Sequence, residues 1–329
     1  MVNYIIRRLL IGLVTLIFIT LLVYGLIRNM PGDPTTLDLG ESNPDKTPSK
    51  EEVARSRASY GLDKSWPEGY LLWVSNIAQG DLDYSRQQKE TVAKLIWRHL
   101  GPTLQLSIPS LLISFMLAVP LGLYSTARNG TFDERATSTF LYMLYSIPSF
   151  VLALLLLIVF YVHLSKTVFH LPIGITSNGF NEMSFLGQVG DLVWHMILPV
   201  FCLTYANLAY YSRFVKANME EVIRQDYIRT ARAKGVHPWN ILIFHAFRNS
   251  LIPFVTMLGL TLPALVSGAI ILEQIFVWPG MGTLFIESLH YRDYVTIMGE
   301  TLLFSVLTLL GQLVADLLYA FVDPRIVYS

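Results

Sequence analysis

The segment QDYIRTARAKGVHPWNILIFHAFRNSLIP, Gln225–Pro253, separates two long apolar stretches and decides how the chain is organised. Seven cationic side chains lie between Arg213 and Arg248, next to sequence apolar enough to cross a bilayer. Gly235 fits the position after a helix end, where a left-handed backbone costs glycine little. Pro238 fits the first turn of a new helix, because the N–H that proline lacks has no partner there. The pattern predicts a short helix, a tight turn and a second helix, which together form a surface suited to binding another protein.

The residues before this turn have helical periodicity. One predicted apolar face holds Met219, Val222, Ile223, Tyr227 and Ala231. Two interpretations fit this face and its surrounding arginines. The helix either docks on a partner protein or rests on anionic lipid, with its arginines marking the cytoplasmic side. Spacing alone slightly favours the lipid interpretation.

The composition is that of a membrane protein. Of 329 residues, 53% are hydrophobic and 15% charged, and the mean hydropathy is +0.48; soluble chains usually carry about 25% charged residues. The formal net charge is zero, so the overall charge says nothing about nucleic acid, and no nucleic acid partner is predicted. The single cysteine, Cys202, has no disulfide partner within the chain.

Apolar stretches of membrane-spanning length recur along the chain. A bilayer core of roughly 30 Å takes about 20 helical residues, and six stretches meet or nearly meet that length: Leu9–Ile27, Leu100–Ala127, Ala136–Val162, Leu192–Ser212, Asn249–Leu272 and Tyr294–Val322. The predicted fold class is therefore an all-α polytopic membrane protein with six transmembrane helices. The first stretch is interpreted as a retained span, because IRNMPGDP after it lacks the small-residue site of a cleaved signal.

The distribution of Lys and Arg predicts the orientation of the chain. Six spans place segments 1–8, 128–135, 213–248 and 323–329 on one side, and these hold most of the cations in short loops. Both termini are therefore predicted to be cytoplasmic. The predicted organisation is the N-terminus and first helix (1–27), an external segment (28–98), a five-helix core (99–322) that includes the cytoplasmic loop 213–248, and a cytoplasmic tail (323–329).

The external segment 28–98 contains two predicted helices. One covers 49–60, after the turn sequence MPGDP. The other lies in WPEGYLLWVSNIAQGDL, where Tyr70, Trp73, Val74 and Ile77 have helical spacing. This second helix is expected to lie against the membrane face or the bundle. A cap over the outer ends of the spans and a contact with an external partner are about equally favoured.

Prolines within the spans, together with intramembrane acids, indicate candidate pathway residues: Ser146, Pro148, Glu273 and Glu300. Buried charges in a membrane are costly and are functional candidates by default. Glu273 is nevertheless expected to reach water near the outer end of its span. Asp316, near the cytoplasmic end of the last span, is expected to form a hydrogen bond that holds the fold.

Motifs for chemistry are missing from the sequence. It has no Gly-x-x-x-x-Gly-Lys-Ser/Thr phosphate loop, and its seven histidines have no metal-ligand spacing. His195 within a span is interpreted as a hydrogen-bonded structural residue. The chain is therefore predicted to be no enzyme and to hold no cofactor or metal.

The segment around Gly235 resembles a motif of a known protein family. The pattern of Arg229, Thr230, Ala231 and Gly235 resembles the Glu-Ala-Ala, three residues, Gly signature of ABC-importer permeases, with arginine at the glutamate position. The departure resembles the variant DYxRTARAKG followed by HAxRNxLIP, typical of the dipeptide, oligopeptide and nickel permeases. Segments 226–235 and 245–253 fit that variant closely.

The resemblance extends along nearly the whole chain. Further strings that match, in order, are YIIRRLL, PGDP (31–34), GLDKSWPEGYLLW (61–73), SIPSF (146–150), WPGMG (278–282), RDY (292–294) and DLLYAFVDPRI (316–326). Each string alone is weak evidence, and their joint order is strong. The chain resembles the first of the two permease subunits in such importers, which has a long external segment after its first span.

The resemblance implies a type I ABC-importer permease fold in a bacterial or archaeal cytoplasmic (inner) membrane. It implies four kinds of partner: a second homologous permease, two cytoplasmic ATPase subunits that bind ATP and Mg²⁺, an external solute-binding protein and the lipid bilayer. The residues implied to couple the permease to an ATPase are Asp226, Tyr227, Arg229, Thr230, Ala231, Arg232, Ala233, Lys234 and Gly235.

The cargo implied by the resemblance is a di- or oligopeptide, because peptides are the commonest substrates of the family. Nickel or another small solute remains the alternative. An ion-coupled secondary transporter is less favoured, since the sequence contains neither clear inverted repeats nor paired buried ionisable residues. An intramembrane enzyme would need a catalytic set inside the spans, and the sequence offers none.

Overall fold

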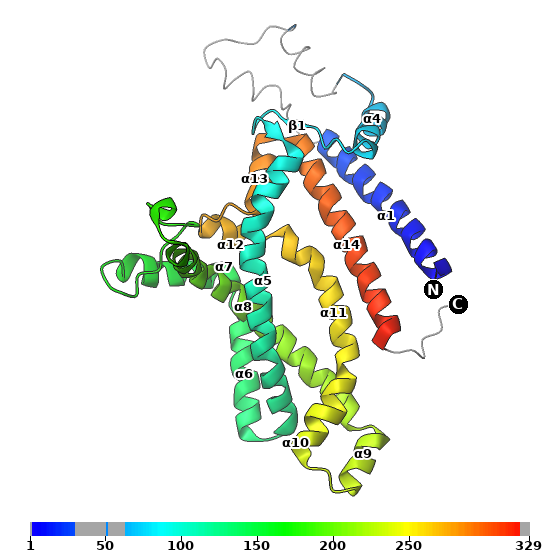
Figure 1. Cartoon of the computed structure of the whole chain (residues 1–329), viewed down its shortest axis with the longest axis vertical. Helices are drawn as coiled ribbons and strands as arrows, with labels where there is room; N and C mark the ends of the chain where they lie inside the picture. The colour runs from blue at the N-terminus through cyan, green and yellow to red at the C-terminus, as the bar shows by residue number, and fades with distance from the viewer. Residues whose placement is uncertain (1, 30–50, 52–62, 323–329) are drawn as a thin grey trace.

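The computed structural model describes residues 2–29, 51 and 63–322, and nearly all of its regular structure is helical (Figure 1). The elements in chain order are α1 (Val2–Arg28), α4 (Trp66–Ala78), β1 (Tyr84–Ser85), β2 (Glu90–Thr91), α5 (Val92–Ala127), α6 (Phe132–Ser146), α7 (Ser149–Leu156), η1 (Leu157–His163), η2 (Phe180–Glu182), α8 (Phe185–Ile223), α9 (Asp226–Ala233), α10 (Pro238–Asn240), η3 (Ile241–Phe247), α11 (Arg248–Ser267), α12 (Ile270–Ile275), α13 (Met281–Tyr291) and α14 (Tyr294–Val322).

Long helices form the body of the molecule. Helix α5 packs along α8, α11 packs along α14, and α1 lies against α14. Helix α4, the antiparallel β1–β2 pair and α13 lie at one end, whereas the α5–α6 turn, α9 and α10 lie at the opposite end (Figure 1). The predicted division of the chain into external and cytoplasmic segments stays a prediction, and so does the assignment of either end to the cytoplasm.

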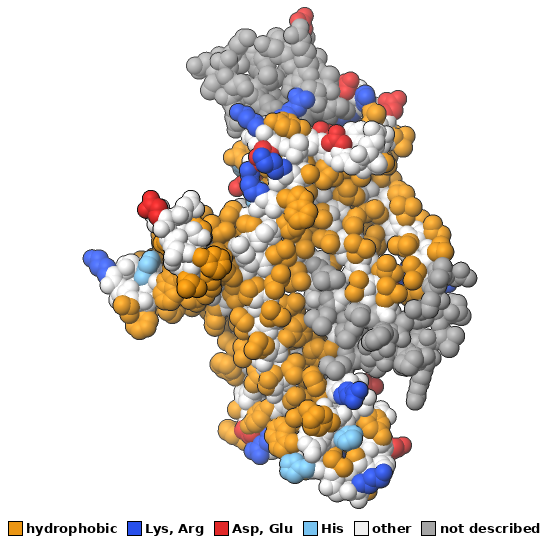
Figure 2. Space-filling view, in the orientation of Figure 1, with side chains coloured by type: hydrophobic (Ala, Val, Ile, Leu, Met, Phe, Trp, Pro, Cys, Tyr) orange, Lys and Arg blue, Asp and Glu red, His pale blue; other side chains and the backbone are white. Residues whose placement is uncertain are grey.

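The described residues contain four helices that are long and apolar enough to cross a membrane, namely α1, α5, α8 and α14, or five if α6 and α7–η1 form one span. Apolar side chains cover the middle of the surface in Figure 2, and most charged side chains lie toward its ends and on the lobe at the left. The predicted fold class, a polytopic α-helical membrane protein, is confirmed. Helix α11 coincides with most of the fifth predicted stretch, and the count of six spans stays a prediction.

The third predicted span, 136–162, is not one straight helix. Helices α6 and α7 meet at an angle of 86°, because Ile147 leaves helical geometry with φ −81° and ψ 119°. A residue that precedes proline is disfavoured in the helical region, and Pro148 follows Ile147. The carbonyl freed at Ile147 accepts a hydrogen bond from Tyr205 Oη at 2.8 Å. The bend is thereby attached to α8.

The fifth predicted span also differs from the structure. It was expected to continue to Leu272, but α11 ends at Ser267. Gly268 then adopts φ 75° and ψ 168°, a backbone conformation that is open to glycine but strained for other residues. The chain restarts as the short helix α12, so Glu273 is not part of the fifth span. We call residues 268–293, between α11 and α14, the folded-back segment.

On the outside of the bundle, α4 packs on α1 as the sequence predicts. Tyr70 is 7% exposed, and its hydroxyl lies 2.9 Å from Thr20 Oγ1. Trp73 packs with Ile27, whereas Val74 is exposed. The packing supports the interpretation of α4 as a cap, and contact with an external partner stays a prediction. The turn MPGDP and the helix expected at 49–60 fall on residues that the structure does not describe, apart from residue 51.

Candidate coupling surface at the end of α8

The turn after α9 has the predicted geometry. Gly235 adopts φ 73°, its N–H donates to the carbonyl of Arg232 at 3.0 Å, and the N–H of Val236 donates to that of Ala231 at 3.2 Å. These two bonds form the glycine-dependent end known as a Schellman motif. Pro238 then opens α10, as expected. The sequence prediction of helix, tight turn and helix is confirmed.

The inner side of α9 is anchored in the protein. Ile228 is 0% exposed and Ala231 7%, and both belong to an apolar cluster with Val215 and Met219 of α8. The predicted apolar face is wrong in one respect, since Tyr227 is 43% exposed. The chain leaves helical geometry at Gln225, with φ −69° and ψ 150°, and this break shifts the buried face of α9 from Tyr227 to Ile228.

The outer surface of α9 is formed by exposed side chains. We define it by the following residues: Asp226, Tyr227, Arg229, Thr230, Arg232, Ala233, Lys234 and Gly235. Arg229 Nη1 lies 3.3 Å from Asp226 Oδ1 in an exposed ion pair. Tyr227 Oη accepts a hydrogen bond from Asn249 Nδ2 at 3.1 Å. Eight of the nine predicted coupling residues are therefore exposed together, and Ala231 supports the helix from inside.

The last turns of α8 connect α9 to the rest of the bundle, and we call residues 215–219 the α8 hub. A Cβ placed on Gly122 of α5 would be 2.5 Å from Val215 Cβ, so α5 and α8 approach closely there. On α11, Ser250 Oγ lies 3.3 Å from Met219 Sδ. Together with the cluster around Ile228, these contacts join α5, α9 and α11 to a single turn of α8.

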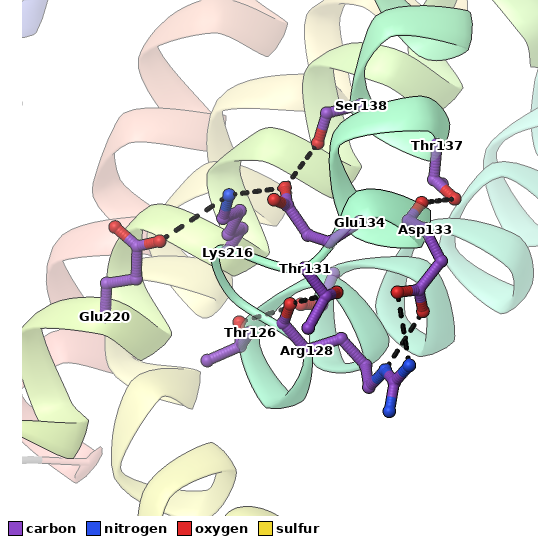
Figure 3. Close-up of polar contacts among 10 residues, drawn as sticks. Thr126, Arg128, Thr131, Asp133, Glu134, Thr137, Ser138, Lys216 and Glu220 are labelled. Atoms are coloured by element: carbon purple, nitrogen blue, oxygen red, sulfur yellow. Dashed lines mark hydrogen bonds and ion pairs between the residues drawn. The ribbon is translucent and has the colours of Figure 1, made fainter.

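A group of polar side chains joins α6 to its neighbours at the same end (Figure 3). Arg128 donates to Asp133 at 2.9 and 3.2 Å across the α5–α6 turn. Glu134 accepts from Lys216 Nζ of α8 at 2.8 Å and from Ser138 Oγ at 2.7 Å. Sequence analysis missed Glu134 and Lys216 as a pair, because they are 82 positions apart and no periodicity relates them.

The candidate pathway residues do not meet at one site. Ser146 and Pro148 are exposed at the α6–α7 bend. Glu300 is 0% exposed, and neither of its carboxylate oxygens has a hydrogen-bond partner among the described residues. Glu273 lines a pocket of about 220 Å³. Thr103 and Ser107 of α5 and Asn207 of α8 lie in the same wall.

Glu273 is 1% exposed, whereas its place near the end of a predicted span had suggested a side chain open to water. Its carboxylate accepts hydrogen bonds from Thr103 Oγ1 and the backbone N–H of Thr283, each at 3.0 Å. A Cβ at Gly268, Gly280 or Gly282 would lie within 3 Å of this carboxyl group. The glycines allow the backbone to wrap around Glu273, so the acid organises the folded-back segment.

Two further predictions from the sequence are confirmed. His195 is 3% exposed, and its Nδ1 lies 2.8 Å from the carbonyl oxygen of Asp191, as expected for a structural histidine. Asp316 pairs with Arg8 of α1 at 3.1 Å, where the N-terminal end of α1 lies beside the C-terminal end of α14 (Figure 1). Asp316 therefore holds two helices together.

Comparison with known families matches this architecture. Residues 118–328 match the family described as "Binding-protein-dependent transport system inner membrane component", and residues 1–107 match the N-terminal region of such membrane components. Across 100% of both chains, the protein is 37% identical to the oligopeptide transport system permease protein AppB of Bacillus subtilis (strain 168). It is 35% identical, again across 100% of both chains, to the glutathione transport system permease protein GsiC of Escherichia coli (strain K12).

A putative peptide permease protein of Brucella ovis is 38% identical over 99% of each chain. Among solved structures, the inward-facing MetNI methionine ABC transporter has a chain that superposes with a TM-score of 0.53 at 20% identity, covering 70% of this chain and 97% of that one. The fold is thus that of an ABC-importer permease, a class of integral inner-membrane proteins. The chain belongs to the family of binding-protein-dependent transport system inner membrane components, which confirms the resemblance inferred from its sequence.

Proposed function

We propose that this protein is one of two permease subunits that form the translocation pathway of an ATP-driven peptide importer. An external solute-binding protein delivers the peptide, and two cytoplasmic ATPase subunits drive the cycle. The proposal is supported by the full-length similarity to relatives named as oligopeptide, peptide and glutathione permeases. Nickel or another small solute is the alternative cargo.

The outer surface of α9 is the proposed docking site for one ATPase subunit. The observation that carries this assignment is the two-sided character of the helix. Its inner residues Ile228 and Ala231 are buried against the α8 hub, whereas its outer side chains are polar and exposed. One side of α9 is packed against α8, and its other side is exposed for a partner. A displacement of α9 by that partner would therefore move α8 as well, because packed interiors deform little.

The proposed orientation places α9 and both termini in the cytoplasm. Segment 213–248, the start of α1 and the α5–α6 turn region hold most cations of the short segments, among them Arg7, Arg8, Arg128 and Arg135, as expected on the cytoplasmic side. The segment 28–98 then faces the outside, where the solute-binding protein arrives. Accessibility of cysteines introduced at exposed Ala233 and Val74 to a membrane-impermeant thiol reagent, in intact cells and in inverted vesicles, tests this arrangement.

ATP and Mg²⁺ are proposed to bind only to the partner ATPases. Closure of the two ATPases around ATP moves their docking grooves toward each other, and α9 is carried with its groove. Because α9 is anchored on the α8 hub, α8 turns with it and the pathway switches between inward-facing and outward-facing states. The contribution of this chain is mechanical, through Ile228, Ala231 and the surface around Arg229.

Disulfide cross-linking tests the docking site with a matched control on the same helix. Ala233→Cys lies on the outer surface of α9 and should cross-link to cysteines placed along the ATPase groove. Ala231→Cys is two residues away but buried, and it should not cross-link. The natural Cys202 is buried as well and does not interfere. No cross-link from Ala233→Cys in an assembled complex, or equal cross-linking from both positions, would overturn the docking site.

Uptake assays test the cargo. The complete importer, with its binding protein, is reconstituted in proteoliposomes that contain ATP. Labelled di- and oligopeptides should accumulate, and accumulation should stop without ATP or without the binding protein. Uptake of Ni²⁺ in place of peptides contradicts the peptide assignment but retains the importer. Uptake by this chain alone contradicts the importer itself.

A further inference from the structure

Helix α6 packs mainly against two other helices, α8 and α5. It leaves α5 at a tight turn and ends at the 86° bend into α7. Much of its remaining surface is exposed, including Phe140 at 60% and Met143 at 63%. Any movement of α6 therefore depends mainly on how firmly it is fixed to α8 and α5.

One ion pair fixes the inner end of α6 to α8. Glu134 in the first turn of α6 is 4% exposed, and its Oε1 lies 2.8 Å from Lys216 Nζ. Ser138 Oγ, one turn further along α6, donates to the same carboxylate at 2.7 Å. Figure 3 shows Glu134 and Lys216 pointing toward each other from the two helices. A second attachment, from Tyr205 to the carbonyl of Ile147, fixes the outer end.

Lys216 belongs to the α8 hub. Its neighbours in that turn, Val215 and Met219, pack in the cluster that anchors Ile228 of α9. The same turn of α8 thus holds α9 through apolar packing and α6 through an ion pair. These contacts form a continuous path from the exposed surface of α9 to the bent α6–α7 segment.

We propose that the Glu134–Lys216 pair is a positioning link that makes α6 follow α8, and so carries the movement of α9 to the α6–α7 segment. The inference rests on the proposed docking function of α9. Both residues act through the helices they connect and contact no substrate. An ion pair suits this role because a mostly buried pair is screened little by salt and is strongly directional when it is also hydrogen-bonded.

The chain contains a matched control for this link. Lys216 Nζ is also 3.6 Å from Glu220 Oε1, but Glu220 lies on α8 itself. Glu220→Gln therefore removes a carboxylate partner of Lys216 without loosening α6 from α8. Glu134→Gln removes the carboxylate that connects the two helices.

The test measures uptake and ATP hydrolysis together in the reconstituted importer. Glu134→Gln should lower the number of solutes imported per ATP hydrolysed by about tenfold, within the range usual for coupling between sites. ATP hydrolysis itself should persist, since α9 and the α8 hub remain intact. Glu220→Gln should retain the wild-type ratio. An unchanged ratio in Glu134→Gln, or an equal loss in Glu220→Gln, overturns the proposal.

A charge exchange separates the link from a general effect on folding. Glu134→Lys combined with Lys216→Glu reverses the pair, and Glu220→Gln is added because Glu at 216 would otherwise repel Glu220 one turn away. Ser138 can donate or accept, so it suits either arrangement. The triple variant should recover most of the wild-type number of solutes imported per ATP hydrolysed, whereas Glu134→Lys alone should not. Failure of the exchange in an assembled complex contradicts the proposal.

A distance measurement avoids reliance on activity. Spin labels at Phe140→Cys of α6 and Glu221→Cys of α8, both exposed positions, report the separation of the helices in a Cys202→Ala background. In the otherwise unchanged complex the distance should stay the same with and without ATP. In Glu134→Gln it should change between the two states, and a constant distance there overturns the proposal.

The outcomes for α9 and for the link are distinguishable. If docking through α9 is wrong, Ala233→Cys fails to cross-link even in the unmodified complex. If only the link is wrong, Ala233→Cys cross-links, the unmodified complex couples hydrolysis to uptake, and Glu134→Gln does so equally well.

Discussion

Thr103 Oγ1 of α5 donates a hydrogen bond to the carboxylate of Glu273 at 3.0 Å and accepts one from the backbone N–H of Met281 at 2.7 Å. One hydroxyl thus connects the long helix α5 both to α12 and to the start of α13, within the segment between α11 and α14. Trp278, 0% exposed, adds a hydrogen bond from Nε1 to the carbonyl of Pro102 at 2.8 Å. The end of the bundle that holds α12 and α13 is organised around these buried polar contacts.

Removing the acceptor at Glu273 should destabilise the protein. Glu273→Met leaves the buried donors of Thr103 and Thr283 without a partner, and we expect a loss of about 3 kcal/mol, as found when one member of a buried polar network is removed. The melting temperature of the purified complex measures the effect. Glu182→Met changes an exposed acid and is the control, so equal melting of the two variants contradicts the structural role of Glu273.

The same substitution at Glu300 should act in the opposite direction. Glu300 is as buried as Glu273, but its carboxylate oxygens have no partner among the described residues. Glu300→Met removes an unsatisfied polar group at similar length, and we expect a gain of about 1 kcal/mol. The measurement is again the melting temperature. A loss of stability comparable to that of Glu273→Met would show that Glu300 has a bound partner.

The close approach of α5 and α8 predicts sensitivity at Gly122. An alanine Cβ there would be 2.5 Å from Val215 Cβ and 2.9 Å from the carbonyl oxygen of Ser212. We expect Gly122→Ala to cost about 1–3 kcal/mol through overpacking. Gly190→Ala in α8 adds a methyl group where no atom lies within 4 Å, and it should melt at or slightly above the temperature of the unmodified protein, because alanine favours a helix over glycine. An unchanged melting temperature in Gly122→Ala would mean that α5 and α8 can move apart at little cost in stability.

A bulky side chain at the end of α9 should interfere with docking. A Cβ at Gly235 meets no atom of this chain within 4 Å, so a large side chain there affects the partner and the left-handed backbone rather than internal packing. Gly235→Trp should lower uptake per ATP by about tenfold. Gly235→Asn should be milder, since asparagine tolerates φ 73° better than other residues with a side chain. Normal coupling in Gly235→Trp contradicts the role of this surface.

The N-terminal start of α5 should respond to acid. Hydrogen bonding to Lys94, together with the charge of Arg98, lowers the pKa of Glu90 below its usual value. A carboxyl group with a lowered pKa in the folded state stabilises the protein at neutral pH, and this contribution is lost as the pH falls through the lowered pKa. The unmodified protein should therefore melt slightly above Glu90→Gln at neutral pH. The difference should vanish on acidification, and a difference that grows in acid contradicts this assignment.

Much of the architecture could be predicted from the sequence. Long apolar stretches indicated membrane helices because burying a helix in lipid needs only length and apolarity. Gly235 and Pro238 indicated the turn after α9 because their backbone limits are local. The bend at Pro148 and the break at Gly268 were missed as ends of spans, although both residues carry the local signal. Proline is common within spans, as Pro102 and Pro109 in α5 show, so the residue type alone does not predict a break.

The sequence by itself determined that this protein is a polytopic α-helical membrane protein with a short glycine-terminated helix between two apolar stretches. Those features depend on composition, periodicity and local backbone preferences. Only the tertiary structure decided that Ile228 rather than Tyr227 faces inward, that Glu273 is enclosed by three glycines, and that Glu134 pairs with Lys216. These contacts join residues across breaks in the helices or across many positions of the chain. No local pattern encodes such contacts, because they arise from how whole helices pack.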